Sequence, residues 1–134
     1  MREINLTEAE LFKNLIEIQD VGIYIDLHND YSCSRLLYDP AQSGDLLIEF
    51  LLIGSEKPFK KVEIVFGDVR VTKMSLQLFD GIHINLTIDN MYRGRFQLGD
   101  ALYEYSNSGR SYYYVDFYEG YAIELFARSL MAIL

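Results

Sequence analysis

The sequence predicts a mostly-β (α+β) fold: an antiparallel β-sandwich or partly open barrel of about 8–10 short strands with one N-terminal amphipathic helix. Three observations predict this class. Apolar residues alternate with polar ones over most of the chain after Gly22. Turn signals recur about every 8–12 residues. A helix-like apolar stripe occurs near the N-terminus, and the pattern after it is that of strands. Strands therefore do not alternate with helices as they would in a parallel α/β sheet.

The length and composition predict a single domain over residues 1–134, with a helix at about 8–19 and a β-meander at about 22–134. Half of the residues are hydrophobic and only two are proline. A chain of this composition can bury a substantial core, so we expect it to be folded and not disordered.

The N-terminal segment has the spacing of a capping box. Thr7 can accept a hydrogen bond from a free amide of the first helical turn, and Glu10 can reach back to the start of the helix. Leu11, Leu15 and Ile18 then fall on one helical stripe. We therefore expect a helix at about 8–19 that ends before Gly22.

The chain from residue 23 onward reads as strands. Residues 23–28 alternate as in a half-buried strand, 34–38 form a weaker strand, and 46–53 are apolar on both faces, as in a central strand. Alternation and turn signals then predict strands at 62–66, 69–71, 74–78, 82–88, 93–98, 101–105, 112–118 and 121–127. Asp80-Gly81 is a strong hairpin signal. The apolar run 125–134 predicts a final strand pair or a docking segment.

The charge balance limits the partners. Twelve basic residues face twenty acidic ones, for a net charge of −8. This average field repels a phosphate backbone, so we expect no nucleic-acid partner, and the acidity favours a basic protein partner. The lysines at 57, 60 and 61 read as a solvated turn.

The sequence predicts a cytoplasmic protein without a membrane partner. Cys33 is the only cysteine, so no internal disulfide can form, which fits a reducing compartment. The first residues lack the pattern of a secretory signal. The most apolar windows, 46–53 and 121–134, are too short to span a bilayer and are interrupted by charges.

The stretch YYYVDFYEG, at 112–120, is the richest functional signal. In an extended strand Tyr113, Val115 and Phe117 share the core face, which leaves the even-numbered positions on the other face. Phenol rings exposed there would favour a protein interface, whereas rings packed across strands would form a second small core. The predicted binding residues are Tyr103, Tyr105, Tyr112, Tyr114, Asp116 and Tyr118.

Other chemistry-bearing residues give weaker patterns. Asp26 and His28, with Asp30 if the strand continues, would point the same way in a strand and could act as a metal or acid–base site. His83 is expected to be an exposed sheet histidine, and Cys33 a partly buried, inert thiol. The sequence carries no phosphate loop, zinc motif, calcium loop or dinucleotide fingerprint, so we expect no cofactor, no metal and no catalytic residue.

These observations favour a non-catalytic protein-binding module, and one concrete version is a small acidic immunity or inhibitor protein that neutralises its partner. A small-molecule-binding barrel or sandwich is an alternative, with Tyr92, Tyr103, Tyr105 and Tyr114 around a pocket. A further alternative is a hydrolase or metal site that uses Asp26 and His28. A homodimer through a strand edge or the C-terminal segment is compatible with the first reading.

Overall fold

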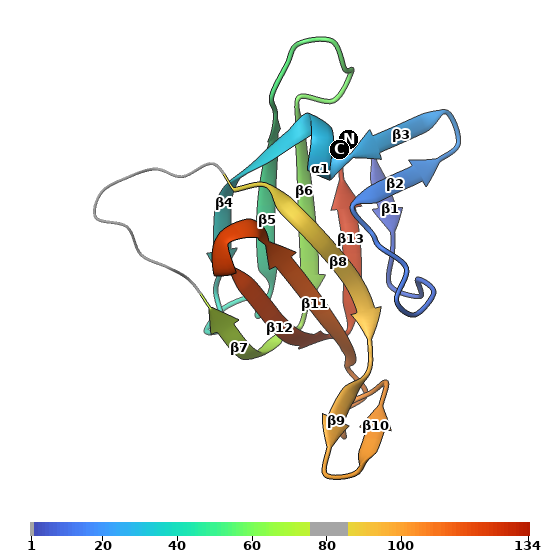
Figure 1. The fold of residues 1–134 in the computed structure, drawn as a ribbon, viewed down its shortest axis with the longest axis vertical. Helices are drawn as coiled ribbons and strands as arrows, with labels where there is room; N and C mark the ends of the chain where they lie inside the picture. Colours follow the sequence, from blue (N-terminus) through green and yellow to red (C-terminus); the bar gives the residue numbers. More distant parts are fainter. Residues whose placement is uncertain (1, 76–85) are drawn as a thin grey trace, which may run out of the picture.

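The computed structural model describes residues 2–75 and 86–134 and is mostly β (Figure 1). Within these residues, five strands form one antiparallel sheet in the order β1-β13-β6-β5-β4. Their bounds are Glu3–Asn5 (β1), Ser129–Ile133 (β13), Lys61–Gly67 (β6), Leu46–Leu52 (β5) and Tyr31–Tyr38 (β4). The strand expected at 46–53 is therefore confirmed as an interior strand, paired on both edges, but the expected cover on both of its faces is not found, because Leu51 is 44% exposed.

A second antiparallel sheet has four strands in the order β7-β12-β11-β8. Their bounds are Arg70–Ser75 (β7), Ala122–Ala127 (β12), Ser111–Phe117 (β11) and Ile88–Gly94 (β8). Two ribbons complete the strands: β2 (Glu17–Asp20) with β3 (Ile23–Asp26), and β9 (Phe96–Leu98) with β10 (Ala101–Tyr103). The described sheets do not close into a barrel.

The core lies between the two larger sheets. Ile48, Ile64 and Phe66 point into it from the five-stranded sheet, and Tyr113 and Val115 point into it from the four-stranded sheet. The rings of Phe66 and Tyr113 meet edge to face, with centroids 5.3 Å apart. Each fully buried aliphatic or phenyl side chain contributes about 1.5–3 kcal/mol, so this shared interior holds the sheets together.

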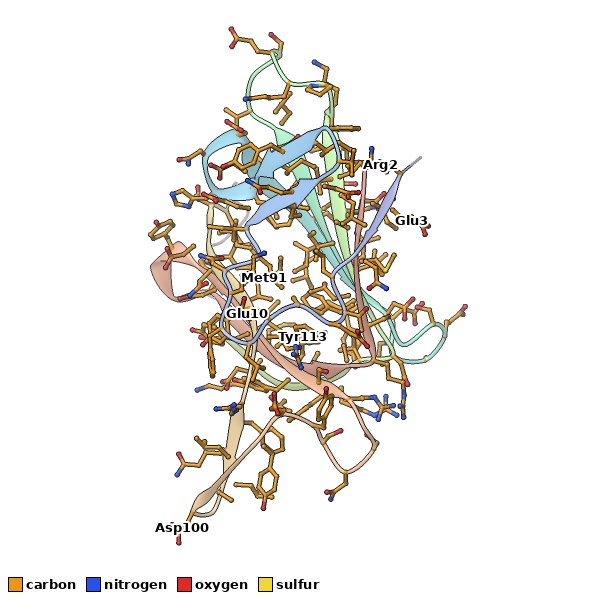
Figure 2. The ribbon with its side chains drawn as sticks, turned by 90° about the vertical axis from the view of Figure 1, so that its right-hand side faces the viewer. Arg2, Glu3, Glu10, Met91, Asp100 and Tyr113 are labelled. Atoms are coloured by element: carbon orange, nitrogen blue, oxygen red, sulfur yellow. The ribbon has the colours of Figure 1, made fainter. Side chains whose placement is uncertain are left out.

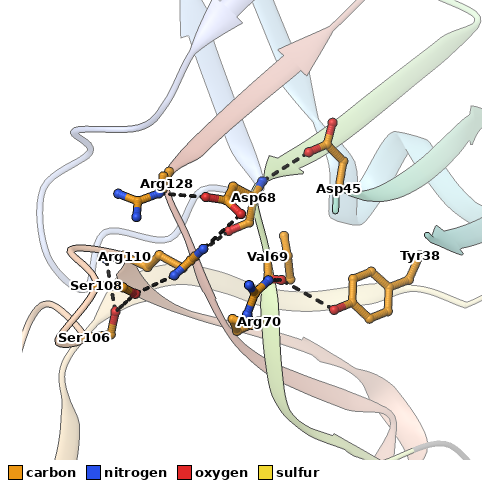
Figure 3. A network of polar contacts seen from close by, with 9 residues as sticks. All are labelled: Tyr38, Asp45, Asp68, Val69, Arg70, Ser106, Ser108, Arg110 and Arg128. Carbon is orange, nitrogen blue, oxygen red and sulfur yellow. Dashed lines mark hydrogen bonds and ion pairs between the residues drawn. The ribbon is translucent and has the colours of Figure 1, made fainter. Parts of the chain in front are cut away.

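The chain crosses between the sheets at a polar corner. This corner contains Gly67, the last residue of β6, Asp68, which follows it before β7, and Arg128, which links β12 to β13 (Figure 3). The Arg128 amide donates to the Gly67 carbonyl at 2.9 Å. A Cβ on Gly67 would lie 2.2 Å from the Ser129 hydroxyl oxygen, so any larger residue there would force that hydroxyl to move.

The predicted helix at about 8–19 is wrong. Those residues form turns and then β2. The segment runs along the free edge of β8, where the Phe12 amide donates to the Arg93 carbonyl at 2.8 Å and the Leu15 amide donates to the Met91 carbonyl at 2.6 Å. Thr7 does not cap a helix: its hydroxyl accepts from the Leu130 amide of β13. These pairings satisfy backbone groups that a helix would have paired internally.

The α-helix of the described chain is instead α1, a single turn over Leu27–Asp30, and a 3₁₀ turn spans Tyr118–Gly120. The described residues form thirteen short strands, more than the about 8–10 expected. The chain is also not a simple meander, because β6 pairs with β13 and β7 with β12. The hairpin expected around Asp80-Gly81 falls in 76–85, outside the described residues.

The C-terminal run forms β13, which lies between β1 and β6 and pairs with both. Leu130 and Ala132 are buried in the core. The run is thus an interior strand of the five-stranded sheet and does not form the expected final strand pair, because β12 belongs to the other sheet. Neither edge of β13 is free for docking.

Candidate protein-binding face

β11 presents one side to the core and the other to the outer surface of the four-stranded sheet. Tyr113, Val115 and Phe117 are buried, as the alternation predicts. Figure 2 shows Tyr113 within the body of the molecule. Tyr114 and Asp116 alternate with them and are half-buried on the outer side. The predicted division of this strand into two faces is therefore confirmed.

Tyr112 was expected to face solvent, and this expectation is wrong, because only 8% of the residue is exposed. Its ring packs on Phe126, its cross-strand neighbour, and on Phe96 at the start of the β9–β10 ribbon, with centroids 5.6 and 6.2 Å away. Its hydroxyl donates to Glu124 at 2.5 Å. Burial, together with the Glu124 carboxylate, raises the pKa of Tyr112.

Phe96 joins the ribbon to the sheet. Its ring meets Phe126 edge to face at 4.7 Å and lies 5.6 Å from Tyr103, its partner across the ribbon. Tyr112 therefore belongs to a second small aromatic core, which the sequence offered as the alternative to an exposed interface. This core fixes the base of a ribbon that projects from the body, with Asp100 at its tip (Figures 1 and 2).

The β9–β10 ribbon exposes large apolar side chains. Leu98 and Leu102 are 65% and 62% exposed, and Tyr103 and Tyr105 are 45% and 54% exposed. Leu98 shares one side of the ribbon with Phe96 and Tyr103, whereas Leu102 lies on the other side. Tyr103 and Tyr105, two of the predicted binding residues, thus face solvent.

A row of three rings continues across the sheet from Tyr114. Tyr92 lies opposite Tyr114 on β8, with centroids 5.4 Å apart, and Phe12 packs 5.8 Å from Tyr92. Phe12 is 57% exposed and has a positive φ of 63°, which is rare for a bulky residue. The N-terminal segment thereby presents an aromatic ring at the rim of the sheet.

Asp116 lies beside Tyr114 and carries an unfavourable charge. Burial raises the pKa of its carboxyl, and the nearby Asp89 raises it further, against a hydrogen bond from Tyr114. Asn90 lies opposite Asp116 on β8, and its buried Oδ1 has no hydrogen-bond partner among the described residues. The fold therefore keeps a carboxylate where it is poorly stabilised, a property common at functional sites.

Tyr118 is exposed but does not lie on β11, which ends at Phe117. It opens the 3₁₀ turn, and its ring centroid is 5.7 Å from that of His28. It stands apart from the Tyr92–Tyr114 row, so the predicted binding residues divide between the ribbon, the sheet and this turn.

We call the aromatic face the outer surface made by Phe12, Tyr92, Phe96, Tyr112, Tyr114, Asp116, Glu124 and Phe126. Two surface grooves lie on it. One, of about 240 Å³, is lined by Lys73, Ser75, Tyr114, Asp116, Ala122 and Glu124. The other, of about 460 Å³, lies at the base of the ribbon between Phe96, Tyr112, Glu124 and Phe126. Glu124 borders both grooves.

The four tyrosines named for a small-molecule pocket do not line the interior between the sheets. Tyr92 and Tyr114 pair on the outer side of the four-stranded sheet, Tyr103 is on the ribbon, and Tyr105 is in the segment that follows it. The interior is instead filled by packed aliphatic and aromatic side chains.

Asp26 and His28 do not share a strand face, so that prediction is wrong. The strand ends at Asp26, whose carboxylate caps α1 by accepting from the amides of His28 and Asn29 at 3.1 and 3.0 Å. His28 Nδ1 lies 2.7 Å from the Ile88 carbonyl oxygen. Burial would raise the pKa of Asp26, but its hydrogen bonds from Asn29 and His28 hold it below the usual value.

Asp30, the third member of that pattern, lies 4.0 Å from the Lys57 ammonium. Across residues 2–75 and 86–134, no group of three or more His, Cys, Asp or Glu side chains is placed to hold a metal ion. Cys33 is buried, and burial raises the pKa of its thiol to about 11, which leaves it protonated and unreactive at neutral pH. His83 lies outside the described residues.

Sequence reasoning missed Phe12, Phe96, Phe126 and Glu124 as members of the aromatic face. One signal was present: a hairpin centred on Glu119-Gly120 pairs residue 114 with 124 and residue 112 with 126. Counting across that turn would have placed Glu124 and Phe126 beside the tyrosines. Phe12 and Phe96 come from elsewhere in the chain and gave no such signal.

Comparison of the chain with protein-family models, with curated proteins and with solved structures finds no match. In the described part of the chain, no helix has the length and apolar character needed to cross a lipid bilayer.

Proposed function

We propose that this chain is a non-catalytic protein-binding module that binds its partner through the aromatic face and the β9–β10 ribbon. One observation carries the proposal: a projecting ribbon exposes Leu98 and Tyr103 on the side that Phe96 anchors to the aromatic rings of the sheet. Contiguous exposed apolar and tyrosine side chains on a fixed support are typical of protein interfaces.

The rigid anchoring adds to this argument. Tyr112, Phe126 and Phe96 hold the base of the ribbon, so its exposed side chains need little further ordering when a partner binds. Pre-organised contacts bind more tightly because less conformational entropy is lost on association. We infer that the two larger sheets form a partly open β-sandwich that acts as the rigid support for the ribbon.

The charge favours a basic partner. The chain carries a net charge of −8, and Asp116 and Glu124 place two carboxylates among the rings. An acidic surface attracts a basic protein and speeds its encounter. The specific version that we propose is a cytoplasmic inhibitor or immunity protein that neutralises a basic partner by covering part of its surface.

Site-specific photo-crosslinking tests the proposal. A benzophenone amino acid replaces Tyr103 on the ribbon in one variant and Leu37, 52% exposed on β4 of the other sheet, in the control. Both variants are irradiated in lysate of the native cell, and cross-linked products are identified by mass spectrometry. We expect one protein to be captured from position 103 and not from position 37, and then to bind the purified chain.

Two results would contradict the proposal: equal capture from both positions, or a captured protein that shows no binding to the purified chain. Capture from position 37 alone would move the interface to the five-stranded sheet.

A further inference from the structure

We infer that the groove of about 240 Å³ on the aromatic face receives an arginine side chain of the bound protein. This inference rests on the proposed function, because it names the chemistry of the partner at one point of the same surface. Its support comes from the register of β11 and β12, from the charges around the groove and from the ring of Tyr114.

The strand register creates the hollow. Tyr114 lies opposite Glu124, and Asp116 lies opposite Ala122, so the two carboxylates sit on the same outer surface at neighbouring positions of adjacent strands. Ala122 is small, and it leaves space beside Asp116 that a larger side chain would fill. The groove therefore has acidic groups at two of its borders and the Tyr114 ring along its wall.

An arginine fits this lining better than a neutral side chain. A planar guanidinium can donate in parallel to carboxylate oxygens and can stack on an aromatic face. One Glu124 oxygen accepts from Tyr112, which fixes the orientation of that carboxylate. Tyr114 is held in turn by its contact with Tyr92, so the ring is already in place.

The charges that act on the groove favour a cation. Asp116 is partly withdrawn from water and lies near Asp89, so its negative charge lacks compensation. A bound guanidinium would supply the missing positive charge. Lys73 is the cation that lines the groove, and it lies opposite Glu124 on β7. Its ammonium competes with an incoming cation, so removing Lys73 and removing Asp116 must have opposite effects.

The test uses a small probe, N-acetyl-arginine amide, with N-acetyl-citrulline amide as its neutral counterpart. Each is titrated into the ¹⁵N-labelled full chain, and amide shifts are followed in the wild type, in Asp116→Asn and in Lys73→Met. We expect saturable shifts at Tyr114, Asp116 and Ala122 with the arginine probe. Binding should be about tenfold weaker with citrulline and in Asp116→Asn, and severalfold tighter in Lys73→Met.

The absence of saturable shifts with the arginine probe would overturn the inference, as would equal binding of the arginine and citrulline probes. Equal affinity in the wild type and in Asp116→Asn would also overturn it. The wild-type spectrum outside the groove must persist in both variants, which shows that they fold.

The outcome is separable from that of the proposed function. If the partner is cross-linked through the ribbon but the arginine probe does not bind, the interface stands and the arginine site falls. If the probe binds as described but no protein is captured through the ribbon, the arginine site in the groove is supported and the proposed ribbon interface is rejected. A lysine probe, N-acetyl-lysine amide, that binds more tightly than the arginine probe would overturn the choice of arginine.

Discussion

Phe12 has a φ of 63°, in the left-handed region where a bulky side chain costs about 1–2 kcal/mol. Its ring is largely exposed and lies over Tyr92, with the Arg95 guanidinium 6.0 Å from the ring centroid. The backbone is held in this conformation by the hydrogen bond from the Phe12 amide to the Arg93 carbonyl. A strained residue at the rim of a proposed interface is the pattern expected where position matters more than stability.

Replacing Phe12 with Gly and with Ala measures this strain. Both variants lose the ring, but only glycine adopts a positive φ without penalty. We expect the free energy of unfolding of Phe12→Gly to exceed that of Phe12→Ala by about 1 kcal/mol, measured by urea denaturation. A more stable alanine variant would contradict the positive φ.

Asp116 predicts a pH dependence. Burial and Asp89 raise its folded pKa, so the folded state binds more protons than the unfolded state between the two pKa values. Stability therefore falls as pH rises through that interval, and the loss is complete above the folded pKa. Asp116→Asn removes this loss. We therefore compare the free energies of unfolding of the variant and the wild type by urea denaturation at acidic and at neutral pH. We expect the difference, variant minus wild type, to be larger at neutral pH than at acidic pH.

A constant difference between wild type and Asp116→Asn across that pH range would contradict the assignment. The comparison across pH matters because the substitution also changes local hydrogen bonding, and only the part of the stability difference that varies with pH reports the titration of Asp116.

Single residues also show what alternation can and cannot predict. The pattern of 112–118 correctly placed Tyr113, Val115 and Phe117 in the core, because a strand has a period of two. It could not reveal that Tyr112 is covered. The ring that covers it, Phe96, belongs to a ribbon whose position depends on tertiary packing.

Among the structural elements, the corner between the sheets depends on two arginines that share Asp68. Arg110 is buried, and it donates through Nη2 to the Asp68 carboxylate at 3.0 Å and through Nε to the Asp68 carbonyl at 2.8 Å. Arg128 is half-exposed and donates to the same carboxylate at 2.7 Å (Figure 3). The two arginines, Arg110 first, hold the pKa of Asp68 below its usual value.

Arg110→Ala and Arg128→Ala form a matched pair. We expect Arg110→Ala to lower the free energy of unfolding by about 2–3 kcal/mol, because a buried charge-assisted contact is lost. Arg128→Ala should cost less than about 1 kcal/mol, because its side chain is solvated. Urea denaturation of both variants checks this difference.

Equal losses in the two variants would contradict the structural ranking. The lowered pKa of Asp68 also predicts how stability changes with pH. Its contribution is present above the unfolded pKa and is lost as pH falls through the folded pKa, so acid should destabilise the wild type more than Arg110→Ala.

The N-terminal segment shows the limit of sequence prediction for an element. The stripe correctly selected Leu15 and Ile18, which are both buried. The stripe predicted the wrong backbone conformation, because the spacing of side chains does not specify which carbonyls accept hydrogen bonds from the backbone amides. The partners of this segment are carbonyls of β8, far along the chain, and long-range pairing overrode the local helical preference.

At the scale of the whole molecule, the sequence predicted a mostly-β fold and several strand positions but not the order of strands. The pairs β6–β13 and β7–β12 join distant segments, and hydrophobic alternation does not specify such partners. The candidate surface was predicted in outline from its tyrosines. The anchoring of the ribbon through Phe96 and the groove beside Asp116 depend on the pairing of distant strands in the four-stranded sheet, which the sequence did not specify.

The central claim is that the ribbon and the aromatic face bind the partner. Leu98, on the side of the ribbon that it shares with Phe96 and Tyr103, and Leu37 on the opposite sheet are both exposed leucines, so replacing either with Ser should change stability by less than about 0.5 kcal/mol. The decisive measurement is the dissociation constant of the cross-linked partner with each variant, by calorimetry. The account predicts at least about tenfold weaker binding for Leu98→Ser and wild-type binding for Leu37→Ser. Unchanged binding in Leu98→Ser, or equal weakening in both variants, would contradict it.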